Sequence, residues 1–158
     1  MFREVLRKKQ VIGQDECIRI LKEEKRGVLS VLGDDDYPYG FPIDHYYDEQ
    51  TGHIFFHCGT VGHKLDAVRR HDKVSYCVYD AGTSEEGDWA LYFKSVIVFG
   101  RIREVKDTDT IIEISRKLSL KFTDDLDYIE DEIKNHGYRT AMLELVPEHM
   151  TGKRVHEK

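Results

Sequence analysis

The sequence is poor in cysteine. Its three cysteines, Cys17, Cys58 and Cys77, are scattered over 158 residues, and no two of them form a CxxC pair. This number is too small for the disulfide framework that stabilises small secreted proteins. Cys17 and Cys77 fall within apolar patterns, so we expect them to pack as small buried hydrophobic residues.

Long apolar runs and an excess of positive charge are also missing. No segment approaches the roughly 20 apolar residues that span a bilayer, and the charged start MFREVLRKKQ has no signal-peptide core. The formal net charge is −6, which disfavours a general nucleic-acid-binding protein. We therefore expect a cytoplasmic protein with no membrane or nucleic-acid partner, in which an anionic ligand would need a local basic cluster. The segment with His63, Lys64, Arg69 and Arg70 supplies one.

The composition is that of a folded globular chain. Hydrophobic residues make up 40% of it and charged residues 34%, values that argue against disorder. The sequence contains no repeat, low-complexity segment or linker. We expect residues 1–158 to form a single domain.

Short strand-like segments dominate the chain. They are rich in β-branched and aromatic residues and are separated by turns. Because they follow one another without alternating helices, they predict a mainly β fold, an antiparallel barrel with peripheral helices. Strands are expected at 27–33, 40–48, 53–58, 73–80, 138–147 and 89–105, the last as one strand or two joined at Gly100. Helices are expected from Gln14 or Asp15 to Gly27 and over 63–70, 108–121 and 124–136, with a polar tail from 148 onward.

The segment HIFFHCGTVGHKLDAVRR concentrates the reactive residue types. On a strand, His53 and His57 lie roughly 13 Å apart, too far to share one zinc ion, whose ligands each approach within about 2.1 Å. Adjacent strand residues point to opposite faces, so His57 and Cys58 do not form a nucleophilic pair. We predict no metal site, and a packed thiol at Cys58.

The same segment also permits a phosphate site. A strand end, two glycines and a helix start follow in CGTVGHK, and free N–H groups at a helix N-terminus attract anions. Thr60 would add a hydroxyl and Lys64 a charge. By spacing alone, an ordinary strand-to-helix turn is an equal alternative. Farther along, Lys94 and Ser95 interrupt an apolar strand, as residues facing water or a polar ligand would.

These elements, in this order, resemble a known family. The segments YPYGFPIDHYYD, IFFHCGTVGHKLDAVRR, SVIVFGR and the late TGK are together similar to the pyridoxamine 5′-phosphate oxidase-like flavin-binding split barrels, and within them to the nitroimidazole-resistance branch. The resemblance implies a six-stranded antiparallel split barrel that forms a homodimer, with two flavins in grooves between the subunits. The flavin implied is FMN, with FAD as an option if the groove is open beyond the phosphate.

The resemblance also implies a role for particular residues. The isoalloxazine edge would be followed by Pro42, Ile43 and Asp44, and the ring and ribityl chain would lie beside His57, Cys58 and Gly59. The phosphate would be bound by Thr60, His63 and Lys64. The long strand would bring Lys94 and Ser95 to the cofactor, and the partner subunit would contribute Trp89 with Thr151, Gly152 and Lys153. Many relatives have Arg or Lys where His63 stands, so a neutral histidine would supply less charge to the phosphate.

The implied function is flavin-dependent oxidoreduction of a small molecule. A nitroaromatic electron acceptor is one option, with His57 as the catalytic residue that protonates the reduced substrate. A non-catalytic flavin- or haem-binding module, with His57 and His45 as candidate haem ligands, is the alternative. Oxidation of pyridoxamine phosphate is a weaker third possibility, because the sequence offers no second basic glycine loop for the substrate phosphate.

Overall fold

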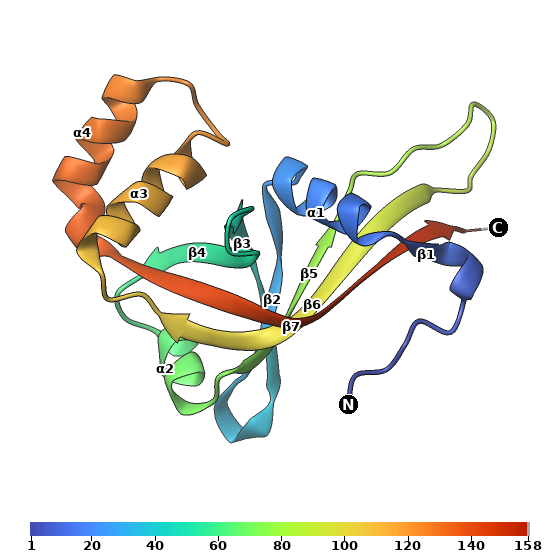
Figure 1. Ribbon diagram of the computed structural model, residues 1–158, viewed down its shortest axis with the longest axis horizontal. Coiled ribbons are helices and arrows are strands. Elements are labelled where there is room, and N and C mark those ends of the chain that lie inside the picture. Colours follow the sequence, from blue (N-terminus) through green and yellow to red (C-terminus); the bar gives the residue numbers. More distant parts are fainter. Residues whose placement is uncertain (158) are drawn as a thin grey trace.

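The computed structural model describes residues 1–157, which contain one strongly curved antiparallel sheet (Figure 1). Strand β6 pairs with both β5 and β7, which closes the strands β2, β3, β4, β7, β6 and β5 into a six-stranded ring. The two residues of β1 add to the edge of β7. The strands are β1 Val11–Ile12, β2 Arg26–Leu32, β3 Pro38–Asp48, β4 His53–Gly59, β5 Lys73–Tyr79, β6 Tyr92–Glu104 and β7 Thr140–His156.

Four α-helices lie around this ring. They are α1 Gln14–Glu23, α2 His63–Arg70, α3 Thr108–Ser119 and α4 Leu126–His136, and short 3₁₀ turns occupy Lys8–Gln10, Asp34–Asp36 and Gly137–Arg139. The predicted mainly β barrel with peripheral helices is therefore confirmed. None of the helices in residues 1–157 is long and apolar enough to cross a membrane.

The main core fills the inside of the ring. Alternate strand residues point inward, as the period of two requires, and they include the fully buried Phe56, Tyr76 and Leu143. Helix α1 adds Cys17 and Leu21, both with no exposed surface. The expectation that Cys17 packs as a small hydrophobic residue is confirmed, whereas Cys77 is only partly buried.

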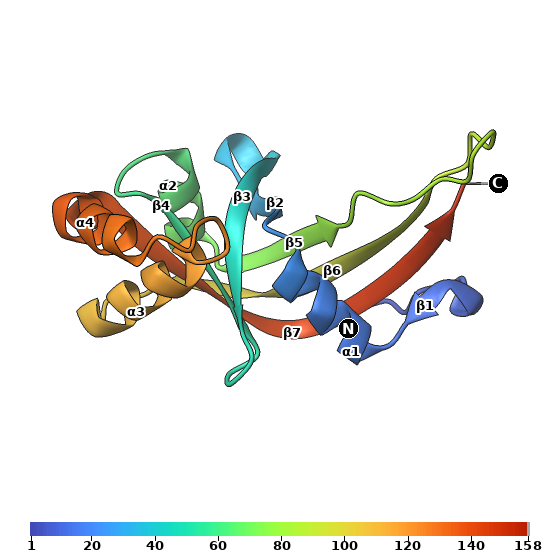
Figure 2. The ribbon, with the colours of Figure 1, turned by 90° about the horizontal axis from the view of Figure 1, so that it is seen from above.

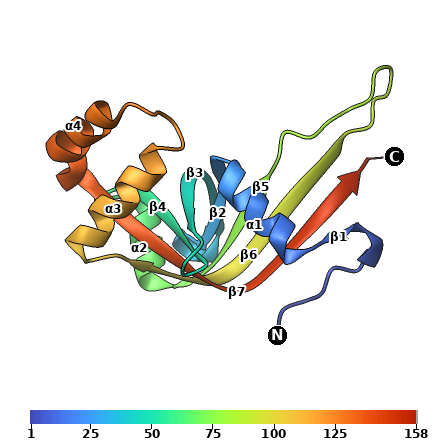
Figure 3. The same cartoon turned by 45° about the horizontal axis from the view of Figure 1, so that its top comes forward.

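Helices α3 and α4 form a hairpin at one end of the molecule (Figures 1 and 3). An aspartate caps each helix: Asp107 accepts a hydrogen bond from the backbone N–H of Thr110, and Asp125 from that of Tyr128, which satisfies donors that a helix start leaves free. Ile114 fixes α3 to the sheet by packing in a small second core, whose strand members are Phe55 and Met142.

Strands β6 and β7 are the longest and run the length of the molecule (Figure 2). The segment around Gly100 is one strand, with an irregular register between Phe99 and Gly100. At Gly100 a Cβ atom would lie 2.2 Å from the carbonyl oxygen of Val146, so only glycine allows this close approach. The predicted end of the last strand at residue 147 is wrong, because β7 continues through the polar tail to His156, paired with β6 and, at Gly152 and Lys153, with β1.

Candidate functional site

Strands β3 and β4 separate at one end of the barrel. They pair only where His45–Asp48 meet His53–Phe56. Beyond that point, within the described chain, residues 38–44 of β3 pair only with β2, and His57–Gly59 of β4 pair only with β7. Each strand therefore presents a free backbone edge to the gap between them, with donors and acceptors that need a partner.

A cavity of about 330 Å³ lies at this gap. It is bordered by Arg26, Pro42, Ile43, Asp44 and His57. The structure thus brings together four residues that the resemblance assigned to the flavin ring. It adds Arg26, which sequence reasoning missed. Arg26 Nε donates to Asp44 Oδ1 over 2.6 Å, because the β2–β3 register sets these two residues opposite each other.

The Asp44 carboxylate affects the pKa of His57 at this gap. The atoms packed around His57 desolvate its ring and lower the pKa of the imidazole, and the Asp44 carboxylate partly opposes that shift. Neutral imidazole is therefore the prevailing form of His57 at neutral pH. It can accept a proton at one ring nitrogen and donate a hydrogen bond from the other.

The neighbouring residue Cys58 has a different environment. Burial raises the pKa of its thiol, and the nearby Lys64 opposes this shift only in part. The thiol is therefore protonated at neutral pH, whereas a nucleophilic cysteine needs a lowered pKa. The packed thiol predicted at this position agrees with that environment.

The loop after β4 leads into helix α2 as the sequence predicted. Gly62 is the N-cap residue at φ 127°, a backbone conformation that favours glycine. No side chain in the described residues caps the helix, so the first-turn N–H groups have no side-chain partner at the N-cap. Thr60 is exposed beside them.

Lys64 and His63 contribute differently to this helix start. Lys64 Nζ lies 4.8 Å from the centre of the Phe41 ring, and Lys64 takes part in none of the ion pairs between residues 1 and 157. His63 is already engaged: its ring stacks on Tyr39 at 4.2 Å between centroids and accepts a hydrogen bond from the Asp34 N–H over 3.3 Å. Lys64 is the cation available to an anion here.

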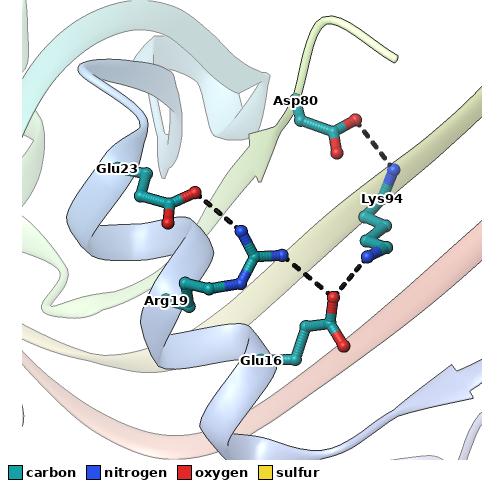
Figure 4. A network of polar contacts seen from close by, with 5 residues as sticks. All are labelled: Glu16, Arg19, Glu23, Asp80 and Lys94. Carbon is teal, nitrogen blue, oxygen red and sulfur yellow. Dashed lines mark hydrogen bonds and ion pairs between the residues drawn. The ribbon is translucent and has the colours of Figure 1, made fainter. Parts of the chain in front are cut away.

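Lys94 and Ser95 lie elsewhere. They sit near the start of β6, which is at the end of the molecule opposite α3 and α4 (Figure 1). The Lys94 ammonium pairs with Glu16 of α1, and its backbone N–H donates to Asp80 Oδ1 over 2.9 Å (Figure 4). Lys94 borders a separate cavity of about 600 Å³ that it shares with Tyr92. One chain therefore does not bring Lys94 to the cavity that His57 borders.

The two histidines considered as haem ligands differ in access. His45 is fully buried, with Nε2 2.6 Å from the Leu21 carbonyl oxygen and Nδ1 2.6 Å from the Tyr76 hydroxyl. Both ring nitrogens are thus occupied, which argues against His45 as a ligand. Among the described residues no group of three His, Cys, Asp or Glu side chains is placed to hold a metal ion. His53 instead pairs with Glu144 over 2.7 Å.

The chain is similar to known proteins in sequence and in fold. Residues 13–154 match the family model described as pyridoxamine 5′-phosphate oxidase, whereas no curated protein matches the sequence. Among solved structures, the chain is similar to a candidate 5-nitroimidazole antibiotic resistance protein from Bacteroides thetaiotaomicron. The two share 14% identity, with 92% of this chain and 87% of that chain covered and a TM-score of 0.75.

Two further solved structures share the fold. A FAD-binding protein from Mesorhizobium loti is 20% identical, with 92% of this chain and 97% of that chain covered and a TM-score of 0.66. The flavocytochrome Anf3 from Azotobacter vinelandii is 16% identical, with 95% of this chain and 72% of that chain covered and a TM-score of 0.71. At these identities the structures establish a common architecture.

Proposed function

Because the chain belongs to the family described as pyridoxamine 5′-phosphate oxidase, we propose that it is a homodimeric, FMN-dependent oxidoreductase acting on a small electron acceptor. Two structural neighbours are described as a FAD-binding protein and a flavocytochrome, which supports a flavin. The observation that carries the proposal is the gap between β3 and β4, with an uncapped helix start beside it.

The gap fits a flavin ring. A planar heteroaromatic ring needs hydrogen-bonding groups along one edge and close walls on its faces. The free edge of β3 at Pro42–Asp44 supplies backbone donors and acceptors, and His57 of β4 borders the same cavity. Arg26, held by Asp44, adds a cation that can meet an electron-rich carbonyl edge.

The helix start fits the flavin phosphate. The free N–H groups of its first turn favour an anion, and a phosphate would gain a charge-assisted bond from Lys64. The Thr60 hydroxyl is exposed at the same loop. His63 is committed to Tyr39 and Asp34, so we assign the phosphate chiefly to Lys64 and the backbone.

A bound flavin would supply the hydride or electron transfer, and the protein would orient the reactants. His57 is the proposed proton-transferring residue. Its lowered pKa keeps the resting ring neutral, so the imidazole would donate a hydrogen bond to the reacting molecule, take up a proton from solvent and pass it to the reduced product. Normal turnover by a flavin-loaded His57→Ala variant would exclude this role.

The separation of Lys94 from His57 supports the homodimer. If Lys94 and Ser95 meet a flavin, a second copy must deliver them, because they lie at the other end of the chain. Strand β6 also exposes Ile97 and Phe99, each about 39% accessible, and apolar side chains of this kind are suited to a subunit interface. Trp89 is 76% exposed nearby in sequence.

The decisive experiment is a visible spectrum of the purified protein, followed by chromatography of the released cofactor. A yellow protein that releases FMN supports the proposal, and released FAD would correct only the identity of the flavin. A colourless protein that takes up neither flavin refutes it. The enzyme should lose its yellow colour when NAD(P)H is added and regain it when a nitroaromatic acceptor is added. A bound flavin that shows no such change would favour the non-catalytic module.

Lys64→Ala tests the phosphate assignment. We expect flavin binding to weaken by roughly 1.5–3 kcal/mol, the range for a hydrogen bond to a charged group. Lys73→Ala is the matched control, because Lys73 is exposed on β5 away from the cavity. Equal flavin affinity in the two variants would show that Lys64 is only a solvated surface residue.

Mixing two defective chains tests the shared site. A heterodimer of Lys64→Ala and Lys94→Ala chains would contain one site with both lysines and one with neither. After random exchange, about one quarter of all sites should regain tight flavin binding. No recovery, with subunit exchange confirmed by native mass spectrometry, would contradict a site built from both subunits.

A further inference from the structure

A second recess adjoins the proposed flavin site on the side of the helical hairpin. It has a volume of about 300 Å³ and lies between the barrel end and α3–α4. Asp44 and His57 border both this recess and the cavity at the gap. A molecule in the recess would therefore touch the two side chains that also face the flavin site.

The walls of the recess suit an aromatic ring. Its floor includes Leu118 and Ile129, each about 3% exposed. Its sides include Phe122 and Tyr128, which keep 46% and 57% of their surface exposed. Large aromatic side chains left open beside an apolar floor gain from covering by a flat ligand.

The charge of the recess selects against anions. Glu132 of α4 and Asp44 of β3 border it, whereas no lysine or arginine of the described chain does. Of the neighbouring cations, Lys121 Nζ donates to the backbone carbonyls of Glu24 and His45. Lys25 Nζ lies 5.2 Å from the centre of the ring of Phe122, which borders the recess. His136 lies 4.0 Å from Glu132 and completes a polar edge.

We propose that this recess binds the electron-accepting substrate, a neutral or cationic compound of one or two aromatic rings without a phosphate or carboxylate group. The ring lies against Phe122 and Tyr128, polar substituents face Glu132 and His136, and the reacting end meets His57. The volume fits, since it is at the lower end of small-molecule sites, which span roughly 300–1,000 Å³. This assignment rests on the proposed function, because it takes the flavin to lie at the neighbouring gap.

The proposal has a consequence for substrate class. A phosphorylated pyridine such as pyridoxamine 5′-phosphate would set its dianion against Glu132, where like charges repel. The other carboxylate of the recess, Asp44, already pairs with Arg26. Such a compound is excluded from the recess, although the family is described by an activity on it. Discrimination by a repulsive group is as effective as discrimination by an attractive one.

Three probes with related chemistry test the charge preference on the whole flavin-loaded protein. They are N-methyl-6-methoxyquinolinium (cationic), 6-methoxyquinoline-4-carboxylate (anionic) and pyridoxal 5′-phosphate. Fluorescence titration should show the quinolinium binding at least tenfold more tightly than the carboxylate, and no displacement of it by the phosphate compound. Equal affinities for the two quinolines would overturn the proposal.

Matched variants locate the probe. Glu132→Gln should reduce the preference for the cation several-fold, whereas the exposed neighbour change Asp131→Asn should not. Tyr128→Ala should weaken both quinolines about tenfold, and Tyr128→Phe should restore binding because the ring remains. Tyr138→Ala, in the 3₁₀ turn that follows α4, should have no effect. Circular dichroism confirms folding of each variant.

The flavin spectrum recorded in the same samples separates the two proposals. If Tyr128→Ala and Glu132→Gln keep their flavin and bind the quinolinium as tightly as the unaltered protein, the recess is not the binding site. The proposed function is then unaffected. If flavin is released in proportion to the amount of probe bound, the two molecules compete for one cavity. That result would also refute the recess as a separate substrate site. A protein that binds the probe but never a flavin overturns the proposed function, and with it the assignment of the bound molecule as substrate.

Discussion

The buried His45 should make the fold sensitive to mild acid. A carbonyl oxygen only accepts hydrogen bonds, so the 2.6 Å contact from Nε2 to Leu21 requires the proton on Nε2. Nδ1 is then the acceptor for the Tyr76 hydroxyl. Protonation of Nδ1 would reverse this bond, turn the Tyr76 hydroxyl toward the Ile43 carbonyl oxygen 3.3 Å away, and leave a positive charge in the core. Desolvation, with a smaller contribution from Lys121, lowers the pKa of His45 from 6.5 to about 4.

The size and sign of the effect follow from that shift. His45 binds a proton less readily in the folded state than in the unfolded state. The contribution of neutral His45 to the free energy of unfolding is therefore fully present above about pH 6.5 and is lost as the pH falls toward 4. The whole shift corresponds to ~3 kcal/mol. At about pH 5, roughly 2 kcal/mol of it is already lost, because the unfolded chain is protonated there and the folded chain is not.

Urea unfolding at about pH 7 and about pH 5 measures this loss. His45→Gln is the comparison, since an amide can donate to the Leu21 carbonyl and accept from Tyr76 but does not titrate. The carboxylates that also respond to acid are common to both proteins. We expect the natural chain to lose roughly 2 kcal/mol more than the variant between the two pH values. A single protein concentration is used throughout, because association adds to apparent stability.

An equal loss in the two proteins would refute the argument, since it would show that His45 carries no pH-dependent stability. An NMR titration gives an independent check. The ring resonances of His45 should not move above about pH 5, in contrast to an ordinary histidine near 6.5. A His45 resonance titrating near 6.5 would contradict the buried, doubly hydrogen-bonded ring.

Two further predictions follow from single contacts. In urea unfolding, Gly152→Ala should destabilise the protein by roughly 1–3 kcal/mol, because its Cβ atom would lie 2.4 Å from Cys17 Sγ. The control Gly137→Ala should leave the stability nearly unchanged, because its Cβ atom would meet nothing closer than 3.8 Å. Asp44→Asn should lower the pKa of His57 further, since the carboxylate now raises it; an unchanged or higher value by NMR would show that Asp44 exerts no such field.

Local patterns predicted much of the fold. Helix α2 begins at His63 and ends at Arg70 as expected, because Leu65 and Val68 repeat with helical spacing and Gly62 precedes them. The barrel strands were found from their β-branched and aromatic residues. Both signals act within a few residues, so they are readable from the sequence.

The errors and omissions depend on contacts distant in sequence. The last residues of β7 are polar and include Gly152, so they lack a strand pattern, and they are extended because β6 and β1 pair with them on both sides. Arg26 was missed because only the β2–β3 register brings it to Asp44. The recess was missed because its walls come from a hairpin whose placement depends on packing at Ile114.

Strand β3 connects the core to the candidate site. With a period of two, His45 and Ile43 face the interior while Pro42 and Asp44 face the gap. A slip of one residue would bury Asp44 and expose Ile43. The hydrogen bonds of the His45 ring fix this register from inside, and Lys121 Nζ holds the His45 carbonyl oxygen at 2.8 Å. The position of Asp44 beside His57 is therefore set by a polar contact in the core, one residue along the same strand.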